Sequence, residues 1–300
     1  MDVGASPLGL IGGAWSATLA TTGLLTSLFN AKIATQRIAD LIIATWNINS
    51  IRQRIGHLTG YLRDVAPDVL CLQEINCQDK DFPAEAIAEC GYCFAVHGQK
   101  TFNGVAILSK QKLEDIQIGL PGDDSDEQAR YLEGSIAAGG RMVRVASIYL
   151  PNGNPPDTDK YSYKLAWMDR LIDRAKDLLA AEEPLVLAGD YNVIPEARDA
   201  RYPQDWTQDA LHLPKTLAQF ARLKNLGLTE ALRATTDAEG LYTFWDYQAG
   251  AWQKNNGIRI DHHLLSAQAA DLLRSVTIDK NMRAAEKPSD HVPIRIELDL

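Results

Sequence analysis

The segment covering residues 185–192 places the strongest constraint on what this chain can fold into. It begins with the apolar run Leu185-Val186-Leu187-Ala188 and ends in Gly189-Asp190-Tyr191-Asn192. This pattern predicts a buried strand that opens into a polar loop. Asp190 and Asn192 are two residues apart, so an extended backbone points both side chains the same way. Taken alone, the segment is equally consistent with an Asx-type turn that ends a strand.

Alternating strands and helices are predicted from residue 41 to the end of the chain. Several predicted strands carry uninterrupted apolar runs, so helices should cover their sheets on both faces. The protein is therefore predicted to be of the α/β class, with residues 41–300 as one domain. The predicted strands cover residues 41–46, 69–73, 105–108, 143–148, 185–188, 258–261, 262–265 and 292–298, and the predicted helices cover 51–65 and about 161–181.

Polar residues suited to phosphate or metal chemistry stand at the ends of these strands. Each of them has a structural explanation when taken alone, because Asn and Asp favour turns and a lone His is usually a hydrogen-bonded loop residue. If all of them meet in one crevice, the carboxylates repel one another unless a cation neutralises them. The series is Asn47, Glu74, Tyr149 with Asn152, Asp190 with Asn192, Asp261, and Asp290 with His291.

The ligand types in this series predict a hard cation. Nearly all of them are oxygen donors, with at most one imidazole, which favours Mg²⁺ with Mn²⁺ able to substitute. Such an ion polarises a phosphoryl oxygen while a fixed carboxylate removes the proton of the attacking water. The sequence therefore predicts metal-assisted hydrolysis of a phosphate ester.

The four cysteines do not point to a metal centre of another kind. Cys90 and Cys93 have the spacing of half a zinc site, but no second close pair exists. We therefore predict that the four cysteines are isolated reduced thiols, with a zinc site as the less favoured alternative. Reduced thiols imply a reducing compartment such as the cytoplasm.

The net charge of −9 at pH 7 limits the classes of partner. It argues against a protein that coats nucleic acid by bulk electrostatics. A polyanionic substrate remains possible, because a bound divalent cation and a few local Arg and Lys residues can reverse the sign inside one cleft.

The first forty residues differ in composition from the rest of the chain. No charged side chain occurs between Val3 and Ala31. No Lys or Arg precedes this stretch, as it would in a secretory signal, and interrupting Gly, Ser and Thr residues make it a poor membrane span. We predict a weakly ordered extension or short helix over residues 1–40, with a membrane anchor as the less favoured alternative.

Six blocks in order along the chain together resemble the exonuclease III family of apurinic/apyrimidinic endonucleases. A single Gly-Asp-Tyr-Asn would be weak evidence, whereas six blocks in sequence are specific. The blocks cover residues 46–52, 72–74, 149–153, 189–192, 256–261 and 289–291, so the resemblance extends from residue 41 to the C-terminus.

This resemblance implies a four-layer α/β sandwich of the DNase I-like type, with two packed mixed sheets flanked by helices. It implies a DNA repair nuclease that cuts 5′ to abasic sites, with 3′–5′ exonuclease and 3′-phosphatase or phosphodiesterase activity. The expected partner is double-stranded DNA with abasic sites or 3′-blocked ends, and the expected state is a monomer without membrane association.

The resemblance also implies roles for the polar residues. Asp190 positions or deprotonates the attacking water, Asn192 holds that water or a phosphate oxygen, and Tyr149 lies beside the phosphate. Whether Asp190 or Tyr149 is the base, and whether one or two metal ions act, is open at this point. Glu74 is expected to bind Mg²⁺, with Asn47, Asp190, Asn192, Asp290 and His291 near the metal.

His291 is expected to pair with Asp261 and to donate to a phosphate oxygen. A neighbouring carboxylate favours the imidazolium form and orients the ring. A cation directed at the phosphorane is then available near neutral pH. The alternative is a purely structural pair.

Residues expected to contact DNA fall into two groups. Arg52 and Lys160 can meet backbone phosphates or be ordinary solvated charges, and Asn152 belongs with them. Phe244 and Trp245 resemble the family's pocket for the flipped-out sugar, although aromatic residues more often pack in the core. This chain departs from the family at two positions. Ile258 stands where vertebrate-type members have Trp, and Pro155-Pro156 stands where some members carry Arg. These two departures leave the balance between endonuclease and exonuclease activity open.

Two rival functions remain at this stage. One is another phosphoesterase of the same superfamily, either a DNase I-like nuclease or an inositol phosphate phosphatase. The other is a catalytically silent DNA-binding or scaffold module, which is disfavoured because every carboxylate of the set is present.

Overall fold

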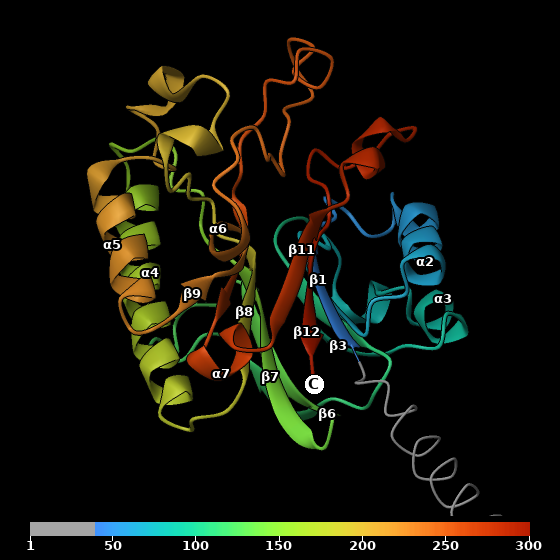
Figure 1. The fold of residues 1–300 in the computed structure, drawn as a ribbon. Helices are drawn as coiled ribbons and strands as arrows, with labels where there is room; N and C mark the ends of the chain where they lie inside the picture. Colours follow the sequence, from blue (N-terminus) through green and yellow to red (C-terminus); the bar gives the residue numbers. More distant parts are fainter. Residues whose placement is uncertain (1–39) are drawn as a thin grey trace, which may run out of the picture. The chain divides into compact units, whose positions relative to one another are not determined.

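Two six-stranded sheets pack against each other in the computed structural model, which describes residues 40–300 (Figure 1). The first sheet has the order β11 (Leu273–Ile278), β12 (Ile294–Asp299), β1 (Asp40–Asn47), β2 (Val69–Gln73), β4 (Val105–Ser109) and β3 (Cys93–His97). The second has the order β5 (Glu114–Ile118), β6 (Tyr131–Ala138), β7 (Arg141–Tyr149), β8 (Leu185–Asp190), β10 (Asp261–Leu265) and β9 (Thr229–Glu230).

Helices cover the outer face of each sheet, which gives four layers (Figure 1). The helices α2 (Ile55–Asp64) and α3 (Ala84–Glu89) lie against the first sheet, and α4 (Asp159–Leu179) and α5 (Pro214–Lys224) against the second. Two short helices, α6 (Ala231–Thr235) and α7 (Ala267–Ala270), pack beside β10. The predicted four-layer α/β sandwich is confirmed.

Burial on both faces explains the uninterrupted apolar runs of the central strands. In β8, Val186 and Ala188 point into the core between the sheets, while Leu185 and Leu187 point outward and pack under α4. Successive side chains of a strand alternate between its faces, so both sets must be apolar when both faces are covered.

In helix α4, periodicity located the helix and most of its buried face correctly. The sequence pattern places Leu165, Met168, Ile172, Ala175 and Leu179 on one face of this helix. Met168, Ile172 and Ala175 are buried, whereas Leu165 and Leu179 are only partly buried. The contact with the sheet is made by Trp167, Met168 and Leu171 and by other residues of the same stripe. The predicted stripe was therefore right at three of its five positions, and it missed Trp167, Leu171 and the buried Lys164.

Two other predicted boundaries are corrected. The first helix begins at Ile55 rather than residue 51, because residues 51–53 form a turn. Residues 258–260 do not form a strand, since Ile258 pairs only through isolated bridges with Ala200 and Phe244.

The register of the strands places the polar residues at one end of both sheets. Tyr149 pairs with Asp190 across the parallel strands β7 and β8, and Asp190 pairs with Asp261 across β8 and β10. In the other sheet, Asn47 at the end of β1 pairs with Gln73, the residue before Glu74. Pairing therefore delivers these side chains to one edge.

The prediction of an extension over residues 1–40 lies outside the described residues, apart from Asp40, which begins β1. That residues 41–300 act as a single catalytic domain stays a prediction. Among the described helices, none has the length and apolar character needed to cross a membrane.

Candidate active site

Asn47 connects the two sheets at the edge where the strands end. Its Nδ2 donates to Glu74 Oε1 at 2.8 Å and to Asp190 Oδ2 at 3.0 Å. The hydroxyl of Tyr149 donates to the same Glu74 oxygen at 2.8 Å. Asn47 ends β1 and Glu74 follows β2 in one sheet, whereas Tyr149 and Asp190 end strands of the other. Hydrogen bonds therefore join the predicted residues across the sandwich.

Local backbone conformation aims these side chains. Glu74 and Asn192 both adopt left-handed backbone, with φ values of 49° and 47°. This conformation costs a non-glycine residue about 1–3 kcal/mol and is concentrated at functional sites. At position 189, a Cβ atom would lie 2.0 Å from the carbonyl oxygen of Ile148. Only glycine therefore allows β8 to approach β7 so closely just before Asp190.

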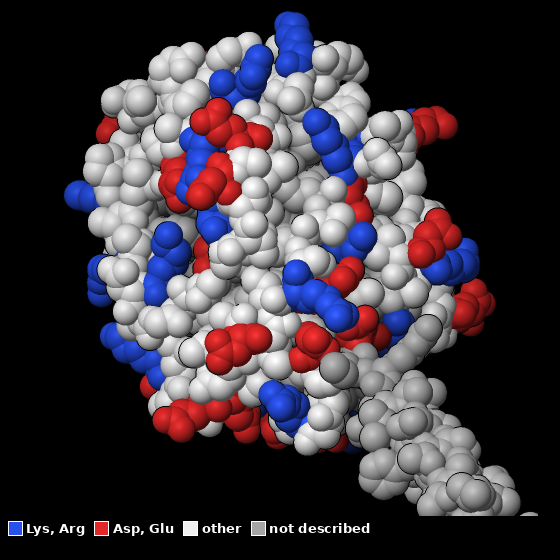
Figure 2. All heavy atoms as spheres, in the orientation of Figure 1, with Lys and Arg blue, Asp and Glu red and all other residues white. Residues whose placement is uncertain are grey.

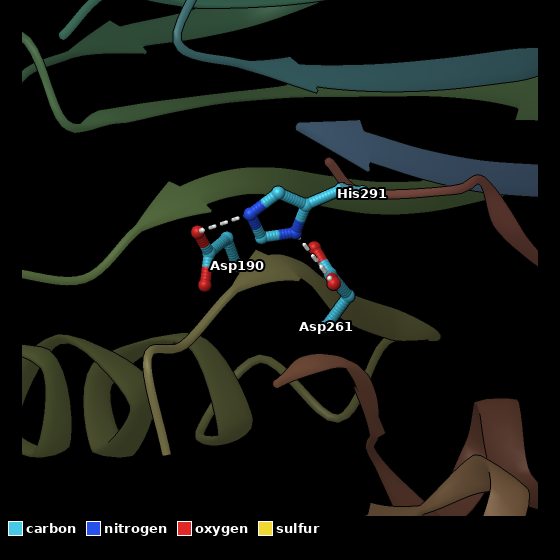
Figure 3. A group of neighbouring side chains, drawn as sticks. All are labelled: Asp190, Asp261 and His291. Atoms are coloured by element: carbon cyan, nitrogen blue, oxygen red, sulfur yellow. Dashed lines mark hydrogen bonds and ion pairs between the residues drawn. The ribbon is translucent and has the colours of Figure 1, made fainter. Parts of the chain in front are cut away.

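The ring of His291 lies between two carboxylates, with one nitrogen facing each (Figure 3). Nδ1 is 2.9 Å from Asp261 Oδ2, and Nε2 is 3.8 Å from Asp190 Oδ2. All three side chains are buried, and the ring of Phe244 meets His291 edge-on at 5.0 Å between centroids. The structure thus brings together the predicted His291–Asp261 pair and sets it against Asp190.

The charges of this group decide the form of the imidazole. Burial lowers the pKa of His291, but the negative charges of Asp261 and Asp190 outweigh burial and raise it to about 10. Burial raises the pKa of Asp190 to about 7, while the positive charge of His291 opposes that rise. His291 is therefore a cation and a hydrogen-bond donor at neutral pH.

Replacement of Asp261 by Asn should destabilise the fold in a pH-dependent way. Because the folded-state pKa of His291 is raised above its usual value of 6.5 to about 10, the ion pair stabilises fully below pH 6.5 and its contribution is lost as pH rises through 10. Breaking a buried pair costs about 3–5 kcal/mol, or a fall in Tm of roughly 10 °C. Thermal unfolding of both proteins in EDTA measures this difference, and an equal gap at pH 6 and pH 11 would contradict the pairing.

Asp290 joins the same edge through a second asparagine. Asn49 donates from Nδ2 to Asp290 Oδ1 at 3.0 Å and from its backbone N–H to Asn47 Oδ1 at 3.1 Å. The hydroxyl of Ser289 donates to the carbonyl of Asn47 at 2.7 Å. Residues 289–291 are thereby attached to the end of β1.

The donor set fits a hard divalent cation. Four carboxylates, those of Glu74, Asp190, Asp261 and Asp290, lie at this edge, and two of them, Asp190 and Asp261, face the His291 ring. Ligand atoms of Asp190, Asp261 and His291 lie within 4.8 Å of one another, and Asp261 Oδ1 is buried without a hydrogen-bond partner. Excess negative charge on oxygen donors favours Mg²⁺ or Mn²⁺. Because the His291 ring is protonated, it is better suited to donate a hydrogen bond than to bind a metal ion.

The residues expected to contact phosphates lie around this edge. Arg52 and Lys160 are exposed, and Lys160 lines a cleft of about 390 Å³ together with Arg130. Asn152 is also exposed, and its Nδ2 donates to Asn192 Oδ1 at 2.9 Å. Figure 2 shows Lys and Arg side chains along the upper rim, where the segments that follow β8 and precede β10 lie, and acidic side chains more often toward the opposite end.

The two aromatic residues predicted to contact DNA, Phe244 and Trp245, differ in position: Phe244 lines a pocket and Trp245 belongs to the core. Phe244 and Ile258 line a cavity of about 310 Å³ together with Trp206. Trp245 is 0% exposed and packs edge-on against Trp252 at 5.1 Å. The predicted DNA contact of Trp245 does not fit this burial, because its ring fills the space beneath the loop that precedes β10.

Sequence reasoning missed three residues that complete the site. Asn49 orients Asp290, and the guanidinium of Arg130 lies 4.7 Å from the ring centroid of Tyr149. Lys164 is fully buried behind Asn152 and Asn192. The available signal was the position of Lys164 on the apolar stripe of its helix, where a charge is costly unless it has polar partners.

A family model described as the endonuclease/exonuclease/phosphatase family matches residues 44–291. The chain belongs to this family. It is 32% identical to exodeoxyribonuclease III of Haemophilus influenzae, with 84% of this chain and 98% of that protein covered. It is 28% identical to the DNA repair nuclease APEX1 of Danio rerio, with 87% and 83% covered. The resemblance to the exonuclease III family and the prediction of a nuclease-type hydrolase are confirmed.

Solved structures lead to the same family. A 3′ phosphatase from Neisseria bound to product DNA hairpin superposes with a TM-score of 0.84 at 36% identity. An AP endonuclease from Archaeoglobus fulgidus superposes with a TM-score of 0.82 at 34% identity. In both comparisons 87% of this chain and all of the other chain are covered.

Proposed function

We propose that this protein is a Mg²⁺-dependent DNA repair nuclease that cuts duplex DNA 5′ to abasic sites and processes blocked 3′ ends. The observation that carries this proposal is the double hydrogen bond of Asn47, which places Glu74 and Asp190 side by side across the two sheets. Nε2 of His291, which pairs with Asp261 through Nδ1, faces the same Asp190 oxygen at 3.8 Å. Carboxylates for a cation, a base and a cationic donor therefore surround one point.

Asp190 is the residue best placed to accept the proton of the attacking water. Its Oδ1 accepts from the backbone N–H of Asn192 at 2.9 Å and its Oδ2 from Asn47, so the carboxylate is held in one orientation. Burial, with the charges of Glu74 and Asp190, raises the pKa of Tyr149 well above its usual value. Tyr149 is therefore a neutral donor near pH 7, which favours Asp190 as the base.

His291 acts on the phosphate, and Asn192, whose Nδ2 donates one N–H to the carbonyl of Leu150 at 2.9 Å, has its second amide N–H left for a phosphate oxygen. The imidazolium of His291 supplies a positive charge and an N–H donor for a phosphate oxygen on which negative charge develops. Glu74, Asp290 and Asn47 would hold Mg²⁺, with Mn²⁺ able to substitute. When bound, such an ion polarises a phosphoryl oxygen and increases the acidity of water.

The cavity beside His291 supports a substrate without a normal base at the reacting nucleotide. Its walls include Phe244 and Ile258, and Phe244 contacts the His291 ring. Apolar side chains complement a deoxyribose that has lost its base, because the flipped sugar exposes apolar carbon atoms and lacks the polar edge of a base. Residues Arg52, Asn152 and Lys160 would contact the flanking phosphates.

Nicking of a duplex with one abasic analogue, compared with intact duplex and a soluble inositol phosphate, tests this function. We expect the abasic duplex to be cut fastest in Mg²⁺. EDTA should reduce the rate by at least ~10²-fold, since several kcal/mol of charge stabilisation are removed, and Mg²⁺ or Mn²⁺ should restore it. Preference for inositol phosphate or for intact duplex, or full activity in EDTA, would overturn the proposal.

The same proposal includes the compartment and the oligomeric state. All four cysteines are free thiols within the described residues, and two of them are buried, which fits a reducing cytoplasm. We propose that the enzyme acts there as a monomer, which light scattering in solution would test.

A further inference from the structure

Lys164 is an ionisable side chain placed where a helix normally carries an apolar residue. It lies in the second turn of α4, on the stripe that includes Trp167, Met168 and Leu171, and it is 0% exposed. Burying an ammonium is costly unless hydrogen bonds compensate it. The contacts of Lys164 therefore indicate what the charge is retained for.

The ammonium of Lys164 binds two carbonyl groups from two different loops. Nζ donates to the carbonyl of Asn152 at 3.0 Å and to the carbonyl of Asn192 at 2.7 Å. No backbone N–H of residues 40–300 donates to either carbonyl. The Asn152 loop follows β7 and the Asn192 loop follows β8, so one side chain ties together the ends of two neighbouring strands.

The same two asparagines are joined to the proposed base on their other side. Asn152 Nδ2 donates to Asn192 Oδ1 at 2.9 Å, and the backbone N–H of Asn192 donates to Asp190 Oδ1 at 2.9 Å. A continuous path of hydrogen bonds thus runs from Lys164 through Asn192 to Asp190. A shift of the Asn192 loop would turn both the carboxamide and the carboxylate.

The neighbouring backbone makes room for the lysine stem. Gly153 adopts left-handed backbone with φ of 89°, and a Cβ atom at this position would lie 2.6 Å from Lys164 Cδ. A side chain at position 153 would therefore displace the stem. The loop is shaped around Lys164.

We propose that Lys164 is a positioning residue for the phosphodiesterase reaction, holding the Asn152 and Asn192 loops in register so that Asn192 and Asp190 face the phosphate. This proposal rests on the proposed function of the same site. Lys164 itself does not contact the substrate, and its effect passes through the two asparagines.

Lys164→Met removes the ammonium and keeps most of the stem. We expect kcat to fall by roughly 10–100-fold, because small displacements of catalytic groups carry penalties of this size. KM, and the Kd for uncleaved abasic-analogue duplex in EDTA, should change by less than about 3-fold, since no DNA contact is lost. Lys164→Arg, which keeps the donors, should recover part of kcat. Lys176→Met on the exposed side of the same helix is the matched control and should behave as wild type.

A double-mutant cycle with Asn152→Ala separates positioning from a general loss of stability. Asn152 is exposed, so this variant should fold. Because Asn152 is also a proposed phosphate contact, the affinity of the variant for the duplex should fall as well, and only kcat at saturating duplex is compared, which should fall to a similar extent. The double variant should be no more than about 3-fold slower than the slower single variant, because residues of one network are not additive. Wild-type kcat in folded Lys164→Met or in Asn152→Ala, or multiplied losses in the double variant, would overturn the proposal. If Lys164→Met does not fold, Gly153→Ala decides the outcome, because its Cβ would displace the Lys164 stem: kcat should fall, and wild-type kcat would overturn the proposal.

Failure of the proposed function would give a different result. In that case the wild-type protein would not prefer the abasic duplex, and the Lys164 series would be measured on whichever phosphoester the wild type cleaves. If wild type and the Lys164 variants then have the same kcat on that phosphoester, only the proposed positioning role of Lys164 is contradicted.

Discussion

Asp190→Asn is expected to lower kcat for cleavage of an abasic duplex by about 10³-fold, the size of effect that follows loss of a general base. The asparagine side chain has nearly the same shape as aspartate but carries no charge. Asp190 accepts two hydrogen bonds, from Asn47 and from the N–H of Asn192. An asparagine offers one acceptor oxygen, so its NH₂ group must face one of these two donors, and the neutral side chain cannot take a proton from water.

Single-turnover cleavage in Mg²⁺ measures this loss, and duplex binding in EDTA tests whether the variant still holds its substrate. Asp173→Asn is the matched control, since Asp173 lies on the exposed side of α4 with 74% of its side chain accessible. The control should cleave as wild type does. A rate for Asp190→Asn within about 10-fold of wild type would transfer the role of base to another group, with Tyr149 the first candidate.

The convergence of these residues followed from the sequence because strand order and strand ends are linked. Parallel strands present their carboxyl ends at one edge, and the pairs β1–β2 and β7–β8 are both parallel. Parallel pairing therefore accounts for Asn47 beside Glu74 in one sheet and Tyr149 beside Asp190 in the other, and the packing of the two sheets brings the two pairs together. Their motifs come directly after apolar runs, which is the pattern that single-sequence reasoning detects best.

Strands that lack such runs were not predicted, and β6 shows why. It carries Glu133 and Gly134 at its centre, which interrupts the expected alternation. Glu133 is nevertheless fully buried, because Arg144 and Arg174 from β7 and α4 pair with it. Such compensation by distant residues is invisible in a local window.

The same limit explains the errors at the site. Lys164 was overlooked because a lysine is normally assigned to the surface, and its two partners are carbonyl groups from loops 12 and 28 residues away in sequence. Trp245 was placed in the substrate pocket because it adjoins Phe244, although a core of Tyr242, Ala251 and Val292 surrounds it. Neighbours in an extended segment point in opposite directions, and the sequence did not indicate which of the two faced inward.

Glu74→Gln should give the second large effect, at least ~10²-fold in rate at low Mg²⁺ concentration, as expected when a charged metal ligand becomes neutral. The substitution leaves the local contacts intact. Asn47 and Tyr149 both donate to Glu74 Oε1, and a glutamine oxygen can accept the same two hydrogen bonds. The loss therefore reports the missing charge rather than a change of fold.

A titration with Mg²⁺ distinguishes this variant from Asp190→Asn. The concentration for half-maximal rate should rise at least ~10-fold in Glu74→Gln, because removing one negative charge weakens attraction for a divalent cation by more than 1.4 kcal/mol. Binding of Mn²⁺ measured by calorimetry should weaken in parallel, without any reaction taking place. Glu85→Gln on the surface of α3 provides the control for a charge change distant from the site. If Glu74→Gln requires no more Mg²⁺ than wild type, the cation is held by other carboxylates, and Asp290, which Asn49 orients toward the same edge, becomes the ligand to test.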